Sequence, residues 1–339
     1  MEGTGGLLPE EAIGQMATGY WISQALRTMA VLGLADHLST GPRTAHELAE
    51  QSGAHAPSLA RLLRALCALG LCSRDDEGRV GLTQLGELLR SDVPDSMKSS
   101  VLMLTAPSFQ RTWEKLPEAV RRGEPTFARV HGVGFWDYLA AHPEEGALFD
   151  AVMTEDAEER AAALLAACDL TGIDTIVDVG GGQGKLLAEL LAAVPRVRGI
   201  LADRPEVVAG AEEVLRTAGV ADRCAVVGGD FFASVPPGGD AYVLAQIIHD
   251  WPEEEALEIL RTCHRAMVPG ARLWVIEQVI QPGEDSVDLT LFDLNMLVFF
   301  GGQERTAEEY QELLEAAGFG EIRVLPTDTD WGVIEGVRP

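Results

Sequence analysis

The sequence predicts an α/β protein in which a mainly helical N-terminal domain precedes a parallel β-sheet with helices on both faces. The chain has 339 residues, more than the roughly 100–200 of a typical single domain, so two domains are expected. After Gly172, strand and helix patterns alternate, which is typical of a parallel sheet covered on both sides. A glycine-rich loop, residues 180–184, directly follows the first of these strands.

The N-terminal elements are helical. Apolar residues recur at helical spacing from Glu10 to Leu34, and so broad an apolar stripe must be covered by something. The stripe comprises Ile13, Met16, Tyr20, Ile22, Ala25, Leu26 and Met29. Thr44 and Glu47 have the spacing of a capping box that begins a short helix.

A further helix and a hairpin complete this N-terminal pattern. Pro57 suits the first turn of a helix through residues 59–66, which ends at Gly70. Residues 71–82 predict a small hairpin around the turn at 75–78. Short helices followed by a hairpin are typical of a winged-helix module, whose second helix often lies in the DNA major groove.

Charge favours a different role for this module. The formal net charge of the chain is −27, and an acidic surface repels nucleic-acid phosphates. The helix in question offers only Arg61 and Arg64 to oppose that charge. We therefore expect no nucleic-acid partner, and predict that residues 1–97 form an apolar dimerisation domain in a homodimer.

Residues 98–170 are expected to form a helical linker that contributes to a substrate pocket, and residues 171–339 the sheet domain. The linker holds much of the chain's aromatic content, in Trp113, Phe127, Phe135, Trp136, Tyr138 and Phe149. Sheet strands are expected at 175–179, 198–202, 224–228, 241–248 and 271–279, and helices at 185–193, 205–218, 253–267 and 306–317. Two last strands, 321–326 and 331–337, predict a terminal antiparallel hairpin.

Composition excludes several classes of protein. No run of 18 or more uncharged apolar residues is present, which argues against a membrane span. Residues 1–11 carry acidic groups and no basic cluster before an apolar stretch, so no signal peptide is predicted and a cytoplasmic location is expected. The five cysteines are scattered, which suits neither a disulfide framework nor a zinc site.

The glycine loop marks where a ligand can approach, because ligands of open α/β sheets bind outside the carboxyl ends of the strands. Gly180, Gly182 and Gly184 follow Asp178 with the spacing Gly-x-Gly-x-Gly, whereas nicotinamide enzymes use Gly-x-Gly-x-x-Gly to bind a pyrophosphate. An acidic residue before the glycines opposes a pyrophosphate but suits a sulfonium and an α-ammonium group. S-adenosylmethionine is therefore the expected cofactor.

Two later strand ends add to this cofactor site. Asp203 ends the second strand and can accept hydrogen bonds from both ribose hydroxyls. After the third strand, Asp230 can accept from the adenine amino group while the ring of Phe231 packs on adenine. Taken alone, Asp230 suits a turn and Phe231 a core position equally well. Their register with the other two strand ends favours cofactor binding.

His249 lies where the fourth strand stops and a proline begins a helix, in the run IIHDWP at 247–252. Strand ends of this kind face the ligand. A lone His is more often structural, but its position and the two later acids, Glu277 and Glu304, favour a catalytic role.

The run from Asp178 to the C-terminus resembles the small-molecule S-adenosylmethionine-dependent O-methyltransferases, which include plant caffeate and flavonoid enzymes, acetylserotonin methyltransferase and bacterial polyketide-tailoring enzymes. The N-terminal region resembles the dimerisation domain of the same family. The motifs that carry the resemblance are DVGGGQG (178–184), DRP (203–205), GDFF (229–232), IIHDW (247–251), Glu277, DLNMLVFFGGQERT (293–306) and EY (309–310). They imply a Rossmann-like methyltransferase sheet behind a mainly α winged-helix dimerisation domain.

The resemblance also implies roles for individual residues. His249 is the expected general base toward a substrate hydroxyl, and Glu277 and Glu304 hold its imidazole. Cofactor-binding residues are expected to be Asp178, Gly180, Gly182, Gly184, Asp203, Arg204, Gly229, Asp230, Phe231 and Gln246. Substrate-binding residues are expected to be Asp250, Asn295, Met296, Phe299, Phe300, Met153, Phe135 and Phe109, although the apolar ones equally suit a core.

The predicted reaction is methylation of a phenolic or enolic hydroxyl on an aromatic natural product. No metal is expected, because no acidic cluster has the ligand pattern that metal-dependent methyltransferases need. Plant members of the family carry Lys and Trp where Ala245 and Gln246 stand, so cofactor contacts from this stretch are less well founded. Two alternatives stay open: a same-fold relative that decarboxylates or hydroxylates, and, more remotely, a winged-helix regulator.

Overall fold

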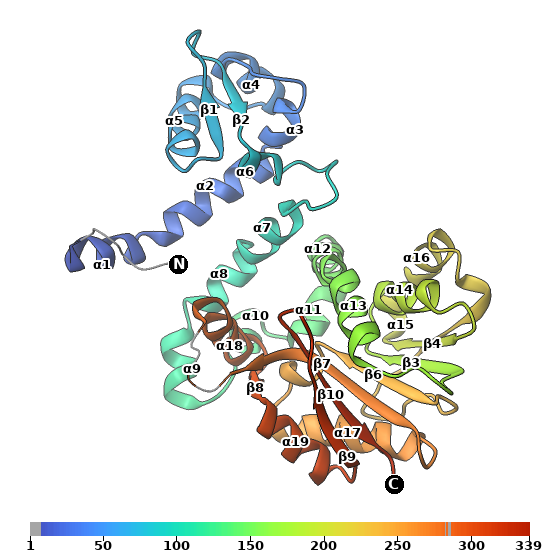
Figure 1. The fold of residues 1–339 in the computed structure, drawn as a ribbon. Helices are drawn as coiled ribbons and strands as arrows, with labels where there is room; N and C mark the ends of the chain where they lie inside the picture. The colour runs from blue at the N-terminus through green and yellow to red at the C-terminus, as the bar shows by residue number, and fades with distance from the viewer. Residues whose placement is uncertain (1–7, 282, 284–285) are drawn as a thin grey trace. The chain divides into compact units, whose positions relative to one another are not determined.

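The computed structural model describes residues 8–281, 283 and 286–339. They fall into two compact units (Figure 1). The first unit runs to Gln110 and includes Ala147–Val152, and the second comprises Arg111–Gly146 and Met153–Pro339. None of the helices formed by the described residues is long and apolar enough to cross a membrane.

The first unit is mainly helical. Its helices are α1 (Pro9–Ala17), α2 (Gly19–Val31), α3 (Leu34–Leu38), α4 (Ala45–Ser52), α5 (Ala56–Ala68), α6 (Gln84–Glu87) and α7 (Lys98–Leu104). The antiparallel strands β1 (Cys72–Arg74) and β2 (Val80–Leu82) form the predicted hairpin. The predicted capping box is present, because Thr44 Oγ1 accepts from the Glu47 N–H and Glu47 Oε2 accepts from the Thr44 N–H at 2.7 Å.

The helical stripe over Glu10–Leu34 is divided between α1 and α2 at Thr18. The Thr18 hydroxyl donates to the Gly14 carbonyl at 2.9 Å, and a side chain that bonds to its own helix in this way competes with the backbone ladder. Much of the predicted stripe is exposed in the single chain. The exposed apolar side chains on these helices include Ile13, Met16, Tyr20, Trp21 and Ile22.

The second unit is built on one mixed sheet with the strand order β5-β4-β3-β6-β7-β10-β9 (Figure 1). Strands β3 to β7 are parallel, and β10 is antiparallel to both β7 and β9, as the predicted terminal hairpin requires. The bounds are β3 (Thr175–Val179), β4 (Arg198–Asp203), β5 (Cys224–Gly228), β6 (Ala241–Ala245), β7 (Arg272–Ile280), β9 (Gly320–Leu325) and β10 (Trp331–Val337). A short strand, β8 (Arg305–Thr306), pairs with the end of β7.

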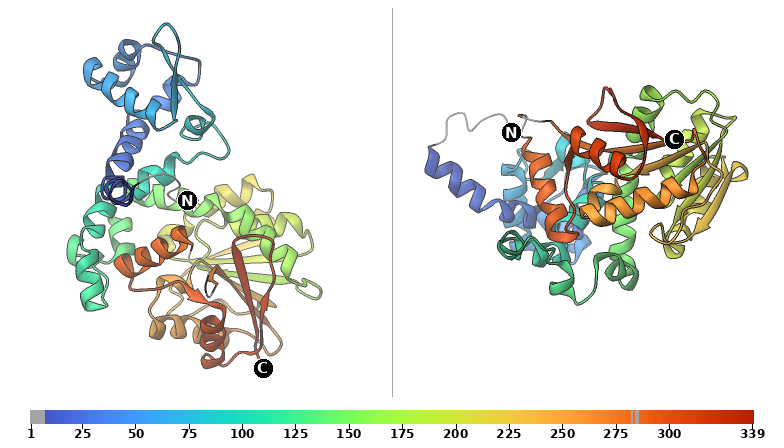
Figure 2. Two further views of the ribbon diagram at one scale, coloured as in Figure 1. Left: turned by 60° about the vertical axis from the view of Figure 1, so that its left-hand side comes forward. Right: turned by 90° about the horizontal axis from the view of Figure 1, so that it is seen from below.

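Helices cover both faces of this sheet (Figures 1 and 2). One face packs under α13 (Ala157–Ala167), α14 (Lys185–Ala193), α15 (Pro205–Val208) and α16 (Ala211–Thr217), and the other under α17 (Glu253–Ala266) and α19 (Ala307–Ala316). Because side chains alternate along a strand, Ile176 packs in the first core and Val177 in the second. The fold class predicted from the sequence is confirmed.

Several elements of the second unit differ from the predicted ones. The helix predicted at 205–218 is broken into α15 and α16 around Gly210. The strand predicted at 241–248 ends at Ala245, and Ile248–Asp250 form a 3-10 turn, η2. A helix that was not predicted, α18 (Val287–Phe299), follows β7. Its apolar residues have little helical periodicity, because α18 is apolar on most of its faces, and it therefore gave no amphipathic signal.

Residues 107–155, which lie within the predicted helical linker and are divided between the two units, are helical, as predicted. They contain α8 (Pro107–Trp113), α9 (Leu116–Arg122), α10 (Phe127–His131), α11 (Phe135–Ala141) and α12 (Pro143–Glu155). Within the second unit, the rings of Phe127 and Phe135 are buried and pack against Phe299 of α18 at centroid distances of 5.5 and 5.7 Å. This aromatic packing joins the helical segment to the region that follows β7.

Candidate active site

The glycine loop turns sharply away from the end of β3. The Gly180 N–H donates to the Ala202 carbonyl of β4 at 2.7 Å, and Gly180, Gly182 and Gly184 all have positive φ, at 73, 60 and 80°. A Cβ on Gly180 would press on the side chain of Ile247, whereas a Cβ on Gly182 would meet nothing within 4 Å. The loop therefore needs glycine at these positions, and it is open on the side of Gly182.

Asp178 is a fully buried acid near the end of β3. Its residue is 1% exposed, and neither carboxylate oxygen has a partner among the described residues. Burial, together with the nearby charge of Asp203, raises the pKa of Asp178 to about 7. A Cβ on Gly181 would collide with this carboxylate. An unpartnered buried carboxylate is costly, so this position suits a cationic ligand group.

Arg160 of α13 is a site residue that the sequence interpretation missed. Its guanidinium is buried, lies 5.2 Å from the ring centroid of Trp331, and donates to Gln246 Oε1 and to the Met153 carbonyl. Its Nε has no partner among the described residues. The charge of the guanidinium is close enough to Asp178 to lower the pKa of that acid, against the larger effect of burial. A signal was available, because Arg160 interrupts an apolar stripe at helical spacing in α13.

Asp203 closes the loop from the end of β4. Its Oδ2 accepts from the Gly182 N–H at 2.8 Å and its Oδ1 from the Arg204 N–H at 2.6 Å. The Gly229 N–H donates to the Asp203 carbonyl at 2.8 Å, which ties the end of β5 to the same corner. Each carboxylate oxygen keeps a second lone pair for a ligand hydroxyl. The side chain of Arg204 pairs instead with Glu206, at 2.7 Å.

Asp230 and Phe231 follow β5, as predicted. Asp230 Oδ1 accepts from the Phe232 N–H at 2.9 Å, so the turn alternative for this residue is realised. The Phe231 ring lies 3.5 Å from the position of a Cβ on Gly180 and 6.0 Å from the Trp251 ring. Phe231 therefore borders the glycine loop.

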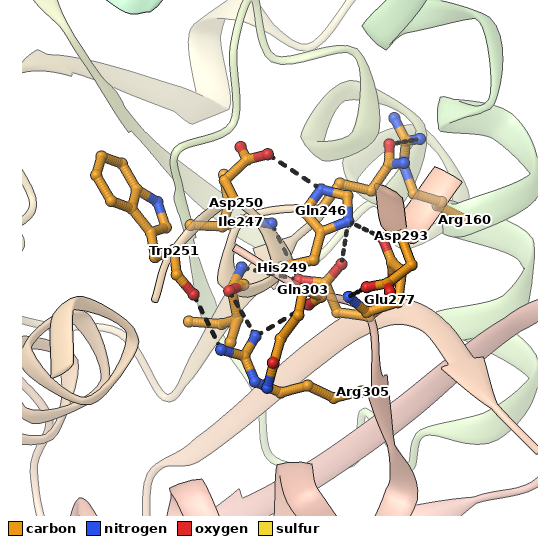
Figure 3. Close-up of polar contacts among 12 residues, drawn as sticks. Arg160, Gln246, Ile247, His249, Asp250, Trp251, Glu277, Asp293, Gln303 and Arg305 are labelled. Atoms are coloured by element: carbon orange, nitrogen blue, oxygen red, sulfur yellow. Dashed lines mark hydrogen bonds and ion pairs between the residues drawn. The ribbon is translucent and has the colours of Figure 1, made fainter. Parts of the chain in front are cut away.

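His249 lies in η2 and is surrounded by the predicted acids (Figure 3). Its Nδ1 is 2.7 Å from Glu304 Oε1 and 3.5 Å from Glu277 Oε2, and its Nε2 is 3.5 Å from Asp250 Oδ1. All four residues are buried. The structure thus brings together the three residues predicted to be catalytic, with Nδ1–H directed at carboxylate and Nε2 as the nitrogen left to act on a substrate.

The charges in this cluster are strongly coupled. Burial by itself favours the neutral imidazole, but the three neighbouring carboxyl groups outweigh it and raise the pKa of His249 to about 10. For Glu277 and Asp250 burial acts in the opposite direction: it disfavours the charged carboxylate and raises the pKa of each acid to about 7. Protons are therefore held tightly here, and His249 is a strong base once its ring is neutral.

Glu277 also holds the backbone that leads to His249. Its Oε1 accepts from the Ile247 N–H at 3.1 Å and the Ile248 N–H at 2.9 Å (Figure 3). Just before them, Gln246 adopts a positive φ of 54°, which is rare and strained for a residue other than glycine. Its N–H donates to the Ile276 carbonyl at 3.0 Å and its side chain accepts from Arg160. Gln246 therefore links α13 to the turn that carries His249.

Helix α18 supplies residues predicted to bind substrate. Phe292 lies 6.0 Å from the His249 ring, measured between centroids. One turn further, Asn295 is buried and its Oδ1 accepts from Trp113 Nε1–H at 3.0 Å. Met296 is buried as well. No role in the site was predicted for Trp113, so its contact with a candidate substrate residue is new.

The remaining predicted substrate residues divide between the units. The Phe300 ring lies 5.0 Å from Phe135 and is stacked on Trp136 at 5.6 Å. Met153 contributes its carbonyl to Arg160. Phe109 belongs to the first unit, whereas His249 belongs to the second. The predicted role of Phe109 in substrate binding therefore stays a prediction.

Within the described part of the chain, no group of three or more His, Cys, Asp or Glu side chains is arranged to hold a metal ion. A mixed sheet with a parallel core, a glycine loop, acids at or just after the ends of β4 and β5, and a buried His–carboxylate cluster together fit the class of methyl-transferring enzymes suggested by the sequence.

The chain belongs to the O-methyltransferase family. Residues 113–320 match the O-methyltransferase domain and residues 15–92 match the O-methyltransferase dimerisation domain. The predicted resemblance to the S-adenosylmethionine-dependent O-methyltransferases is confirmed, as is enzymatic O-methyl transfer. A dimerisation domain is present at the predicted end of the chain.

Similar proteins agree with this assignment. The phenazine O-methyltransferase of Lysobacter antibioticus is 41% identical over 96% of this chain and 95% of its own length. The crystal structure of LaPhzM matches with a TM-score of 0.93 and 39% identity, over 98% of this chain and 100% of that one. An O-methyltransferase from neocarzinostatin biosynthesis, solved with S-adenosylmethionine and 2-hydroxy-5-methyl naphthoic acid, matches with a TM-score of 0.82 and 36% identity, over 94% and 96%.

Some proteins similar to this chain catalyse reactions other than O-methylation. The aclacinomycin 10-hydroxylase of Streptomyces purpurascens is 36% identical over 87% of this chain and 80% of its own length. An 8-amino-8-demethylriboflavin N,N-dimethyltransferase of Streptomyces davaonensis is also 36% identical, over 93% and 91%. The family therefore includes members that methylate nitrogen or hydroxylate, and family membership alone does not identify the acceptor molecule.

Proposed function

We propose that this protein transfers a methyl group from S-adenosylmethionine to a phenolic or enolic hydroxyl of a small aromatic natural product, with His249 as the general base. The observation that carries the proposal is the buried contact of 2.7 Å between His249 Nδ1 and Glu304 Oε1, with Glu277 at 3.5 Å. This arrangement leaves Nε2 as the proton acceptor and stabilises the imidazolium that forms.

The described residues fit the cofactor. Asp178 offers an unpartnered buried carboxylate, and Arg160 a buried cation with an unpartnered Nε. These opposite charges suit the ammonium and carboxylate groups of an amino acid. Asp203 has lone pairs free for the ribose hydroxyls, while Phe231 and Asp230 suit the adenine ring and its amino group. When bound, S-adenosylmethionine supplies an electrophilic methyl group on a sulfonium.

His249 prepares the acceptor oxygen. A phenol has a pKa of about 10, so at neutral pH its hydroxyl is a weak nucleophile until a positioned base removes the proton. Since the carboxyl groups around His249 raise its pKa to about 10, proton transfer from a phenol to its neutral ring is nearly balanced in free energy. Glu304 accepts from Nδ1 and keeps Nε2 free for the proton.

The surroundings of His249 suit a planar acceptor. The Phe292 ring of α18 lies 6.0 Å from the His249 ring, and Asn295 lies on the same side of that helix, one turn away. At the end of α18, Phe300 is stacked on Trp136. An indole N–H can only donate, so the bond from Trp113 to Asn295 Oδ1 leaves the Asn295 amide nitrogen as a donor. The bound aromatic acid in the neocarzinostatin relative is of the proposed substrate class.

The exposed apolar side chains of α1 and α2 support a homodimer. These side chains belong largely to the dimerisation domain at residues 15–92, and Tyr20 and Trp21 are each more than 60% exposed in the single chain. Large exposed apolar patches usually mark interaction sites. We expect a second copy of this chain to cover them. The predicted cytoplasmic location stays a prediction.

A His249→Gln variant tests the proposed base. Gln cannot accept and pass on a proton as imidazole does, so methyl transfer should fall by about 10²–10⁴-fold, the usual weight of a general base. Donor affinity, measured by calorimetry, should stay within about twofold, because the cofactor residues named above do not include His249. Turnover is followed with labelled donor and a panel of phenolic and polyketide acceptors. Unchanged turnover on an accepted substrate removes His249 from the mechanism.

One relative is a hydroxylase, so hydroxylation or decarboxylation is the alternative to methyl transfer that needs a test. If the chain used the donor for hydroxylation or decarboxylation, product would form without stoichiometric release of S-adenosylhomocysteine. The His249 cluster favours methyl transfer, because a base with two carboxylates behind it serves hydroxyl deprotonation. Quantifying S-adenosylhomocysteine against product by mass spectrometry separates the two reactions.

A further inference from the structure

Arg305 is a buried residue that none of the roles above includes. It follows Glu304 directly, lies in β8, and is 1% exposed. Its Nη1 donates to the Ile248 carbonyl at 2.9 Å, and its Nη2 donates to the Trp251 carbonyl at 2.9 Å (Figure 3). The two carbonyls flank His249 in the chain. One planar guanidinium therefore bridges the backbone before and after the proposed base.

The residues around Arg305 strengthen this attachment. The Gln303 N–H donates to the His249 carbonyl at 2.9 Å, and Arg305 Nη1 also donates to the Gln303 carbonyl at 3.3 Å. A Cβ on Gly302 would collide with the His249 carbonyl, so the two backbones touch there. Residues 302–305 thus hold the turn η2 through its carbonyls, while Glu304 holds the imidazole of His249.

The turn η2 needs such external support. It is only three residues long, and its own backbone hydrogen bonds, from Asp250 N–H to the Ile247 carbonyl and from Trp251 N–H to the Ile248 carbonyl, are both long at 3.3 Å. It also follows Gln246 with its strained positive φ of 54°. Carbonyls left unpaired in a buried turn would be costly. The fork of an arginine can satisfy two carbonyls in fixed geometry, which a lysine ammonium on its flexible stem cannot do.

We propose that Arg305 is a positioning residue for methyl transfer: its guanidinium fixes the backbone on both sides of His249 and so keeps the ring in contact with Glu304. This inference rests on the proposed function, in which His249 is the base. Arg305 does not touch the reacting atoms. Its effect reaches them through the position of the imidazole.

A simpler role for Arg305 is to neutralise the buried acids. The nearby acids include Glu304, and Asp293, whose Oδ1 accepts from the Glu304 N–H at 2.8 Å. Charge alone would be preserved by Arg305→Lys, whereas the bridge between two carbonyls would be lost. The lysine variant therefore separates positioning from neutralisation.

Arg223 provides a matched control. Its Nη1 donates to the Val197 carbonyl at 2.7 Å and its Nη2 to the Leu191 carbonyl at 2.8 Å, so it makes the same two-carbonyl bridge. It lies before β5, at the opposite end of the parallel strands from His249. Arg223→Lys should therefore cost stability without affecting the reaction.

The experiment compares Arg305→Lys and Arg305→Gln with Arg223→Lys and Arg223→Gln. We expect kcat to fall by about 10–10²-fold in the Arg305 variants, since a displacement of about 1 Å of a reacting group can cost 10²-fold. Donor affinity should stay within about twofold, and thermal denaturation should show that the Arg305 variants remain folded at the assay temperature. The Arg223 variants should keep full kcat.

A spectroscopic readout reports the imidazole directly. The Nδ1–H proton of His249, which donates to Glu304, should give a downfield proton resonance in the folded enzyme, identified by its absence from His249→Gln. This resonance should move or broaden in Arg305→Lys and stay in place in Arg223→Lys.

The outcomes decide the inference. An Arg305→Lys enzyme with full kcat and an unmoved resonance overturns it. If both Arg305 variants fail to fold while both Arg223 variants fold, Arg305 is structural and the inference is likewise overturned. Full activity of His249→Gln would instead remove the proposed base, whatever Arg305 does. An inactive His249→Gln beside a fully active Arg305→Lys would defeat the positioning role alone.

Discussion

Replacing Glu304 by Gln gives a sharp test of the His249 cluster. The substitution keeps the shape of the side chain and an oxygen that can accept from Nδ1–H, but it removes the negative charge 2.7 Å from that nitrogen. A hydrogen bond to a charged group contributes about 1.5–3 kcal/mol. At about 1.36 kcal/mol per pKa unit, loss of this charge should lower the pKa of His249 by about one to two units.

The direction in which the pH profile moves follows from the protonation state of His249 that the reaction needs. The carboxyl groups raise the pKa of His249 to about 10, so the imidazolium persists at neutral pH and activity should rise as pH increases toward that value. With Glu304→Gln, the rise should move to lower pH by one to two units, the shift derived from the hydrogen-bond energy above. The maximal kcat should fall by about 10–10²-fold, because the imidazolium formed in the reaction loses the same stabilisation.

The assay is a kcat–pH profile with saturating donor and acceptor, together with the donor dissociation constant at each pH. Glu335→Gln is a suitable control, since Glu335 is another buried acid, accepts from Trp274 Nε1–H at 3.0 Å and has no contact with His249. We expect that control to lower stability and to leave the pH profile in place. A Glu304→Gln profile that does not move, or that moves to higher pH, would refute the proposed coupling.

Three further predictions concern the surroundings of the cluster. Burial raises the pKa of Asp178 to about 7, so its contribution to the stability of the free enzyme is fully present below about pH 4 and is lost as pH rises to 7. Asp178→Asn should therefore flatten the fall in unfolding free energy with pH, measured by denaturant titration, and should weaken donor binding in calorimetry. Trp113→Phe should raise the acceptor KM by about 5–150-fold, the equivalent of about 1–3 kcal/mol for an unpaired Asn295 amide, with donor affinity unchanged. Gly302→Ala should lower kcat by about 10²-fold, as its Cβ would displace the His249 carbonyl, and full kcat in a folded variant would contradict that contact.

The fold could be predicted largely from local patterns. Alternating strand and helix segments, the glycine loop after Val179 and the terminal hairpin each depend on residues close together in the chain, and the structure has all of them. The breaks at Thr18 and Gly210 were not predicted, because periodicity continues across a helix break. Helix α18 was missed because it is apolar on most of its faces.

The position of His249 at a strand end favoured a catalytic role, but the roles of Glu277 and Glu304 in holding its imidazole were predicted only through the family resemblance. His249, Glu277 and Glu304 lie up to 55 positions apart in sequence, and no spacing rule shows that they meet. The topology explains the meeting: β6 and β7 are parallel neighbours, so the turn after β6 and the end of β7 share one edge of the sheet, and β8 brings Glu304 to the same edge by pairing with β7.

The sequence by itself determined the class of fold, the position of the glycine loop and the residue types available at each strand end, since these follow from local periodicity and from the order of elements. Only the tertiary structure decided which side chains share a proton, which buried charges lack a partner and which residues hold others in place. Arg160, Trp113 and Arg305 acquire their roles from contacts with distant parts of the chain, and burial determines what those contacts do, because charges and hydrogen bonds interact strongly only where water is excluded.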